Sequence, residues 1–211
     1  MNKRARCPRC ERALVACFCH SITALDNALS VVILQHPSEV KHAKGTAKIV
    51  ELSLNNCQLL VGEDFCDDDT FTPLIKAKKS LLLYPNDNAI TPTQLVVHLQ
   101  QKSQQETQPN PSSSLADYQL IVIDGSWKKA YKIFCLNPVL ATLPCIGIEV
   151  VNESNYRIRK SSRSDSLSTL EAIHSLLTTL EGDKFEGLLT TFDIMVNFQL
   201  QSMPTDVQAR Y

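Results

Sequence analysis

The feature that most constrains this chain is the apolar run at Tyr118–Asp124 (YQLIVID), the clearest predicted strand in the sequence. Its nearly continuous apolar character indicates a strand buried on both faces, as in a parallel sheet covered by helices. Two shorter apolar runs, Ser30–His36 and Ser80–Tyr84, are each followed by a proline. Segments with helical spacing separate the strands. The sequence therefore predicts an α/β fold with a mostly parallel sheet and flanking helices.

The other elements follow from the spacing of apolar residues and from residues that start or stop helices. We expect further strands at Cys57–Val61 and Cys145–Val151, and helices at Thr46–Leu54, Pro92–Gln101, Trp127–Cys135 and Phe185–Gln201. Another helix is predicted to begin with a capping box at Ser168–Glu171 and to end at Gly182. Residues 102–116 are polar and contain prolines, which predicts a flexible surface insertion.

The length of 211 residues accommodates one well-packed domain and a small appendage. We expect a cysteine-rich module at 1–25 and a main domain at 26–211, with the insertion at about 102–116. No apolar run approaches the roughly 20 residues that cross a bilayer. The basic residues at 1–12 are followed by cysteines rather than by an apolar stretch, which argues against a secretory signal. We therefore expect a cytoplasmic protein.

Several functional classes are made improbable by motifs that the sequence lacks. It has no Gly-x-Gly-x-x-Gly turn and no Walker-type phosphate loop, which argues against a Rossmann dinucleotide-binding fold and a P-loop NTPase. It also lacks the Gly-x-Ser-x-Gly elbow of α/β-hydrolases. The 21 Lys and Arg residues against 22 Asp and Glu give a net charge of −1, so a polyanion would bind local basic patches.

The cysteines gather near the N-terminus, where Cys7, Cys10, Cys17 and Cys19 have the spacing C-x2-C-x6-C-x-C. Four thiolates can complete a tetrahedral zinc shell, with each short pair presenting its sulfurs from a tight turn. A redox-active C-x-x-C pair or a chance grouping is the alternative interpretation. Four protein ligands leave no open coordination position, so a zinc ion here would be structural rather than catalytic.

The tetrapeptide Asp124-Gly125-Ser126-Trp127 directly follows the strongest strand. Open α/β sheets bind ligands at the carboxyl ends of their strands, so a carboxylate, a glycine and an indole at this position can bind a substrate. The alternative is that Asp124 caps the following helix and that Trp127 packs into the core. The residues alone leave both interpretations open.

Basic residues outside the cysteine module form two further groups. Tyr156–Lys160 alternates cationic and apolar side chains, so Arg157 and Arg159 would share one face of an extended segment and bind phosphate oxygens. A solvated edge strand is the alternative. Residues 128–132 hold a lysine cluster.

His36, at a strand end before Pro-Ser-Glu, pairs an imidazole with a carboxylate, although a buried, hydrogen-bonded histidine is the alternative.

Taken together, these segments resemble the DTW-domain family, the tRNA-uridine aminocarboxypropyltransferases. The matching pieces cover about residues 4–180 and are the cysteine module at 7–19, ILQHPSE at 33–39, Thr46, LLLYP at 81–85, VIDGSW at 122–127, YRIRK at 156–160 and STLEA at 168–172. Two positions depart from the family pattern. Ser126 replaces the threonine of the family name, and Gly45 stands where asparagine is expected.

The resemblance implies a SPOUT-like architecture with a C-terminal trefoil knot. It also implies transfer of the 3-amino-3-carboxypropyl group of S-adenosylmethionine to N3 of a uridine in the variable loop of tRNA, with release of 5′-methylthioadenosine. A SPOUT-type RNA methyltransferase and a non-catalytic, zinc-containing RNA-binding module are the alternatives. The expected partners are tRNA and S-adenosylmethionine, with structural Zn²⁺, no DNA and no membrane, in a monomer or homodimer.

The resemblance also implies roles for individual residues. Asp124 would act as general base or orienting acceptor for the imide proton, Ser126 would hold a hydrogen bond, and Trp127 would stack on the base or close the pocket. The expected S-adenosylmethionine-binding residues are Leu83, Tyr84, Pro85, Asp124, Gly125, Ser168, Thr169 and Glu171. The expected tRNA-binding residues are His36, Lys128, Arg157, Arg159 and Lys160.

Overall fold

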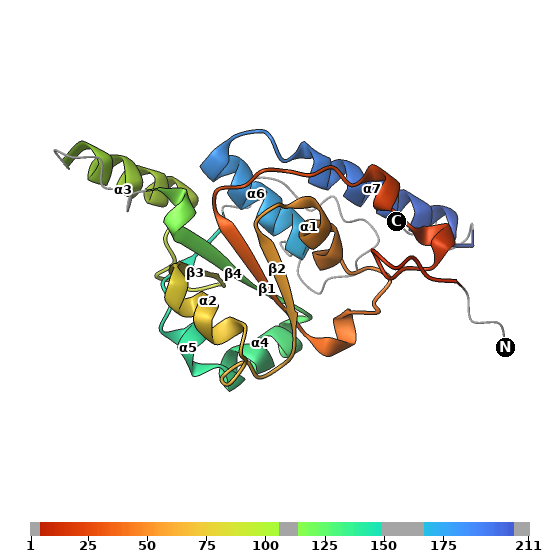
Figure 1. The fold of residues 1–211 in the computed structure, drawn as a ribbon, viewed down its shortest axis with the longest axis horizontal. Helices are drawn as coiled ribbons and strands as arrows, with labels where there is room; N and C mark the ends of the chain where they lie inside the picture. Colours follow the sequence, from red (N-terminus) through yellow and green to blue (C-terminus); the bar gives the residue numbers. More distant parts are fainter. Residues whose placement is uncertain (1–4, 106–113, 149–166, 205–211) are drawn as a thin grey trace.

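The computed structural model describes residues 5–105, 114–148 and 167–204 (Figure 1). In these ranges the strands are β1 (Ser30–Gln35), β2 (Cys57–Val61), β3 (Lys79–Leu83), β4 (Tyr118–Asp124) and β5 (Cys145–Ile146). The α-helices are α1 (Ala47–Ser53), α2 (Phe71–Ala77), α3 (Pro92–Gln105), α4 (Trp127–Leu136), α5 (Pro138–Ala141), α6 (Thr169–Glu181) and α7 (Glu186–Gln201). Short 3-10 helices are η1 (Leu14–Ala16), η2 (Cys19–Ser21), η3 (Pro37–Glu39) and η5 (Leu115–Asp117).

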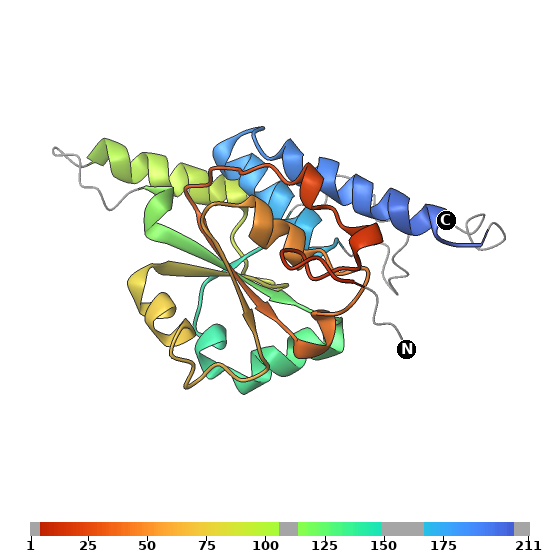
Figure 2. The same cartoon turned by 45° about the vertical axis from the view of Figure 1, so that its right-hand side comes forward.

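The strands form one parallel sheet in the order β2-β1-β4-β3-β5. Helices α1, α6 and α7 lie over one face and α2, α4 and α5 over the other (Figures 1 and 2). The central strand β4 shows why both layers are needed. Its Leu120 and Val122 belong to the core under α1 and α6, whereas Ile121 packs with Ile133 of α4 and Leu140 of α5. This arrangement confirms the predicted α/β fold with a parallel sheet.

Two predicted elements have different bounds in the structure. Helix α3 continues to Gln105 instead of ending at Gln101, because residues 102–105, which follow Gln101, include no proline or glycine that would end a helix. Part of the segment expected to be a flexible insertion is therefore helical. Strand β5 contains Cys145 and Ile146, which pair with β3, and does not include Gly147 or Ile148; residues 149–151 of the predicted strand lie outside the described residues.

Two helices were not predicted from the sequence. Helix α2 follows an acidic segment, where the Asp68 carboxylate accepts hydrogen bonds from the backbone N–H groups of Thr70 (2.9 Å) and Phe71 (2.7 Å). Helix α5 starts directly after Asn137, a fully buried residue whose amide donates to the carbonyl oxygens of Glu63 (2.9 Å) and Ile133 (2.6 Å). Both helices are short and follow a turn in which a polar side chain bonds the backbone, a feature that apolar periodicity does not detect.

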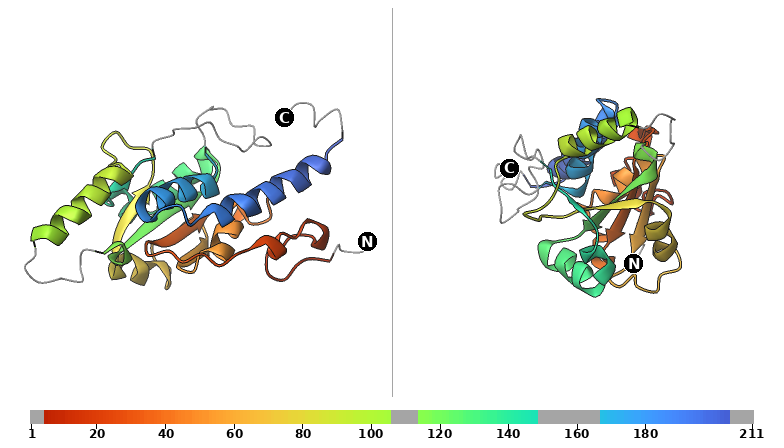
Figure 3. Two further views of the ribbon diagram at one scale, coloured as in Figure 1. Left: turned by 90° about the horizontal axis from the view of Figure 1, so that it is seen from above. Right: turned by 90° about the vertical axis from the view of Figure 1, so that its left-hand side faces the viewer.

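The cysteine-bearing segment lies along α7 (Figure 3). The Thr191 hydroxyl of α7 donates to the Ser21 carbonyl oxygen over 2.9 Å.

A trefoil knot would involve the chain between β5 and α6, and residues 149–166 lie outside the described residues. No helix in the described parts of the chain combines the length and the apolar character that a membrane span requires.

Helix α6 begins and ends as its sequence predicts. The Ser168 hydroxyl accepts from the Glu171 backbone N–H over 3.2 Å, and the Glu171 carboxylate accepts from the Ser168 N–H over 2.8 Å. At the other end Gly182 takes a φ of 87°, a left-handed conformation that glycine adopts without a Cβ clash.

The last residue of α6 ties the helix to the start of the sheet. The Glu181 carboxylate accepts from the backbone N–H groups of Ala28 and Leu29 at 2.9 Å each, and its side chain is only 4 % exposed. Lys184 lies 3.0 Å from the same carboxylate. These bonds hold the segment that enters β1.

We predict that Glu181→Ala lowers the free energy of unfolding by about 3 kcal/mol, because the substitution removes a charged acceptor from two amides near the core. Urea unfolding followed by circular dichroism measures this loss. Glu186→Ala is the matched control, since that carboxylate is 68 % exposed and its removal should cost less than about 0.5 kcal/mol. Equal unfolding midpoints for the two variants would contradict the assigned role of Glu181.

Candidate functional site

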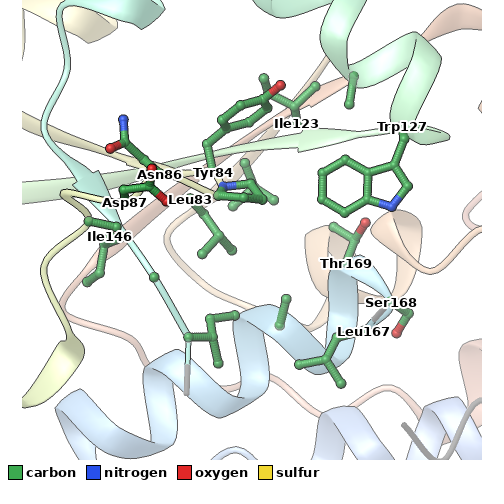
Figure 4. Close-up of a pocket in the computed structure, with 18 residues that line it drawn as sticks. Leu83, Tyr84, Asn86, Asp87, Ile123, Trp127, Ile146, Leu167, Ser168 and Thr169 are labelled. Atoms are coloured by element: carbon green, nitrogen blue, oxygen red, sulfur yellow. The ribbon is translucent and has the colours of Figure 1, made fainter. Parts of the chain in front are cut away.

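A cavity of about 830 Å³ opens where the carboxyl ends of β3 and β4 meet the start of α6 (Figure 4). The predicted site residues that line it are Leu83, Tyr84, Pro85, Gly125, Trp127, Ser168 and Thr169. These residues come from three separate segments that the sheet order brings together, because β3 and β4 are neighbours. The position agrees with the general location of ligand sites in open α/β sheets.

Asp124 lies next to the cavity but is not among its lining residues. It is 8 % exposed, and its carboxylate accepts from the Gln35 side-chain amide over 2.8 Å and from the Thr169 hydroxyl over 2.5 Å. Gln35 and Asp124 are direct partners in the β1–β4 register. Thr169, which lines the cavity, is therefore the link between the carboxylate and the cavity.

The interpretation of Asp124 as a helix cap is wrong. Ser126 is the N-cap residue of α4, and the Asp124 carboxylate is directed to Gln35 and Thr169 instead. Ser126 is exposed and its side chain makes no capping hydrogen bond. Trp127 is not a core residue either, since 46 % of it is exposed while it lines the cavity near Thr169 (Figure 4).

The wall formed by β3 and the following loop is partly aromatic. The Tyr84 ring stacks on Phe134 of α4, with centroids 4.7 Å apart and an angle of 9° between the planes. Burial of its hydroxyl raises the pKa of Tyr84. Asn86 and Asp87, which the sequence did not single out, continue this wall (Figure 4). This wall therefore combines apolar side chains with the polar side chains of Asn86 and Asp87.

The opposite wall is the N-terminus of α6, where the capping box restricts which groups can bind a ligand. The Glu171 carboxylate is bonded to the Ser168 N–H, and Glu171 is not among the lining residues. The Ser168 hydroxyl accepts from the Glu171 N–H. The Leu170 N–H donates to the Thr46 hydroxyl over 3.4 Å. The Thr169 N–H has no hydrogen-bond partner within the described residues, which leaves it available to a ligand.

His36 belongs to an ionic cluster near the carboxyl ends of β1 and β4. Its Nε2 lies 2.6 Å from the Glu63 carboxylate, and its Nδ1 accepts from the Ser38 N–H over 3.1 Å. The Lys132 ammonium also bonds Glu63, and this bond holds the pKa of Glu63 below its ordinary value. Neither His36 nor Lys128 lines the cavity. Lys128 lies on α4 and is exposed to solvent.

Cys7, Cys10, Cys17 and Cys19 converge as the spacing predicts, with all four sulfurs within 4.8 Å of one another. The Sγ atoms of Cys7 and Cys19 are 3.7 Å apart, as are those of Cys10 and Cys17. Zn–S bonds of about 2.3 Å in a tetrahedron place sulfurs roughly 3.8 Å apart, so the geometry fits zinc. Backbone N–H groups of Cys10 and Arg9 lower the pKa of Cys7 to about 6, whereas burial and the neighbouring sulfurs raise the pKa of Cys19, so a cation would be needed to hold all four as thiolates.

Arg12 connects the cysteine module to the loop after β1. Its guanidinium donates to the carbonyl oxygens of Ala43 and Gly45 at 2.8 Å each and lies 5.0 Å from the centroid of the Phe18 ring. This loop leads directly to Thr46 at the start of α1. The module therefore contacts the segment that carries Thr46, whose hydroxyl accepts a hydrogen bond from the Leu170 N–H of α6.

The basic residues Arg157, Arg159 and Lys160 lie outside the described residues. The sequence analysis missed Gln35, which contacts Asp124, and also Ile146, Gly147 and Ile148, which line the cavity. For Gln35 a signal was present, because a glutamine at the end of an otherwise apolar buried strand needs a polar partner.

Comparison with known proteins gives the family. Residues 4–200 match the model of the DTW domain. The chain is 29 % identical to tRNA-uridine aminocarboxypropyltransferase 2 of Drosophila melanogaster over 99 % of its length and 80 % of that protein. It is 27 % identical to the Macaca fascicularis protein of the same name, of which it spans only 65 %. It is 24 % identical to tRNA-uridine aminocarboxypropyltransferase A of Arabidopsis thaliana, over 94 % of its length and 82 % of that protein.

No solved structure matches the chain in a search of known structures. The family model nevertheless spans the cysteine module, the residues that line the cavity, helix α6 and nearly all of helix α7. The resemblance that the separate motifs indicated therefore extends over nearly the whole chain, and the chain belongs to the DTW-domain family.

Proposed function

We propose that this protein transfers the 3-amino-3-carboxypropyl group of S-adenosylmethionine to N3 of a uridine in tRNA, in the variable loop, and releases 5′-methylthioadenosine. The observation that carries the proposal is the cavity at the ends of β3 and β4. Segments of the family pattern that are far apart in the sequence, LLLYP, VIDGSW and STLEA, all contribute to its lining. Relatives of the chain are named tRNA-uridine aminocarboxypropyltransferases, and these names support the transferred group and its tRNA-uridine acceptor.

The cavity has the size and chemistry for the donor. Its volume of about 830 Å³ lies in the range of small-molecule sites. Leu83, Tyr84, Pro85 and Ile146 offer an apolar surface for the adenine. The N-terminus of α6 favours an anion, so the Thr169 N–H and the Ser168 hydroxyl would receive the carboxylate of the methionine part, with Gly125 allowing close approach. Glu171 acts indirectly, by fixing the helix start.

The reaction replaces a C–S bond by a C–N bond. The sulfonium makes each attached carbon electrophilic, and the pocket selects the product by the carbon that it holds in line with the nucleophile. As N3 of uracil bonds to the aminocarboxypropyl carbon, the C–S electron pair returns to sulfur and the imide proton leaves N3. The proton needs an acceptor at the cavity.

Asp124 and Thr169 provide that acceptor together. The Thr169 hydroxyl donates to Asp124 and keeps lone pairs that face the cavity, so it can take a hydrogen bond from N3–H while its own proton moves to the carboxylate. Gln35 keeps the carboxylate in place. Trp127 would cover the uracil, and Ser126 at its side would bond the edge of the base.

Contacts with tRNA would surround this cavity. Lys128 on α4 and His36 near it would contact the RNA, and the segment with Arg157, Arg159 and Lys160 would add phosphate contacts whose strength falls with salt. We also propose that 1–25 forms a zinc module, that 26–211 forms the catalytic domain, and that the domain has the SPOUT-like knot. The free thiols of the cysteines suit a cytoplasmic protein.

The product itself tests the proposed function. Wild-type protein incubated with S-adenosylmethionine and unmodified tRNA should yield a uridine that carries the aminocarboxypropyl group, as measured by nucleoside mass spectrometry. Asp124→Asn keeps the shape of the side chain but removes its charge, so we expect at least a hundredfold lower rate with little change in donor affinity. A methyl-sized mass gain would indicate a methyltransferase, and tRNA binding without any donor binding would indicate a non-catalytic module.

A pair of substitutions at Thr169 tests the proton path. Thr169→Val is nearly isosteric but lacks the hydroxyl, and we expect it to lower kcat by roughly 10- to 100-fold. Thr169→Ser retains the hydroxyl and should stay within about threefold of wild type. Single-turnover kinetics at saturating donor and tRNA measures both rates. Equal rates for the two variants would show that the hydroxyl has no part in the proton transfer.

Metal analysis tests the zinc module. We expect about one zinc per wild-type chain and none in the Cys7→Ser, Cys10→Ser double variant, because serine is a poor zinc ligand. Loss of about 2–3 kcal/mol of stability would lower Tm by roughly 5–10 °C. Cys66→Ser, at an exposed cysteine outside the cluster, is the control and should keep its metal. Full metal content in the double variant would refute the site.

A further inference from the structure

The outer face of α4 carries two large aromatic side chains. Trp127 is 46 % and Tyr131 is 61 % exposed, and they are separated by one helical turn. Residues four apart on a helix share a face, with their Cβ atoms about 6 Å apart. Two large rings on one face next to a cavity form an apolar patch of the kind that marks a ligand-binding surface.

Tyr131 follows Trp127, a lining residue of the cavity, by one turn of α4. The same helix carries Phe134, on which the ring of the lining residue Tyr84 stacks. Trp127 lines the cavity directly. The two aromatic residues therefore continue the cavity wall outward along α4.

The charge of α4 indicates which ligand fits this face. The helix has the sequence WKKAYKIFCL, with lysines and no acidic residue. Lys129 is paired with Glu39 and Lys132 with Glu63, whereas Lys128 is exposed and forms no ion pair within the described residues. Aromatic rings next to a lysine are the combination that binds bases and phosphates of an unpaired strand. A second copy of the same face would bring like charges together.

We propose that Tyr131 is the stacking site for the nucleotide adjacent to the target uridine, so that the enzyme binds an unpaired stretch rather than an isolated base. This inference rests on the proposed function, which puts the uridine against Trp127. Four residues of helix rise about 6 Å, comparable with the separation of neighbouring bases in an unstacked strand. The neighbour of a uridine in the cavity would then reach the Tyr131 ring, with Lys128 close to the connecting phosphate.

The intrinsic fluorescence of the protein offers a direct measurement, because Trp127 is its only tryptophan. Quenching is titrated with uridine 5′-monophosphate, with the trinucleotide ApUpA, and with trinucleotides that carry an abasic ribose at one flanking position. Variants are Tyr131→Ala and Tyr131→Phe. Leu136→Ala is the control, since Leu136 is also exposed on α4 but faces away from the aromatic pair.

We expect Tyr131→Ala to weaken ApUpA binding roughly tenfold, the effect of one lost base–aromatic stack, and to leave the monophosphate unaffected. Removing one of the flanking bases should weaken wild type to a similar degree and Tyr131→Ala hardly at all. Tyr131→Phe and Leu136→Ala should bind as wild type does. If Tyr131→Ala binds ApUpA as tightly as wild type, the inference is wrong.

Two further outcomes separate this inference from the proposed function. Normal aminocarboxypropyl transfer to tRNA, with ApUpA binding unaffected by Tyr131→Ala, would overturn the inference and leave the proposed function intact. Tyr131-dependent ApUpA binding without transfer would support the stacking site and overturn the proposed function. If Tyr131→Ala instead converts a dimer to a monomer in light scattering and leaves ApUpA binding unchanged, the face is a contact between copies and the inference fails.

Discussion

The buried carboxylate of Asp124 is the interaction on which the arrangement of the site depends. A carboxylate with little access to water requires hydrogen-bond donors in place of its hydration. Gln35 provides one from β1 and Thr169 provides another from α6. The two donors belong to segments that are far apart in the chain. Their hydrogen bonds to this one carboxylate therefore hold the carboxyl ends of β1 and β4 against the start of α6. The cavity is the space that remains between them.

The cysteine module strengthens the same region from outside. Arg12 holds the carbonyl oxygens of Ala43 and Gly45, and Thr46, which follows them, accepts a hydrogen bond from the Leu170 N–H of α6. A continuous set of contacts therefore runs from the cysteine cluster to the helix that lines the cavity. A metal ion that orders the module would also order the loop between β1 and α1, although it would lie outside the reacting groups.

The sequence predicted well the elements that are stabilised by many apolar residues. Strand β4 has its predicted bounds, and α6 has its predicted cap and end, because apolar spacing and terminal residues act together there. Helices α2 and α5 were missed because each is short and follows a turn held by a polar side chain, that of Asp68 or Asn137, rather than showing apolar periodicity. The candidate site was predicted in part. The positions of Tyr84 and Trp127 followed from strand ends and motifs, but the partners of Asp124 depend on strand order.

The start of α6 shows how local structure limits the chemistry of the site. A helix begins with unpaired N–H groups, and each can serve either the fold or a ligand. The capping box uses those of Ser168 and Glu171, and Thr46 uses that of Leu170. Only the Thr169 N–H remains without a partner within the described residues. The residue that can bind the donor carboxylate through its amide is thus the one whose hydroxyl contacts Asp124. Donor binding and proton acceptance would be coupled through Thr169.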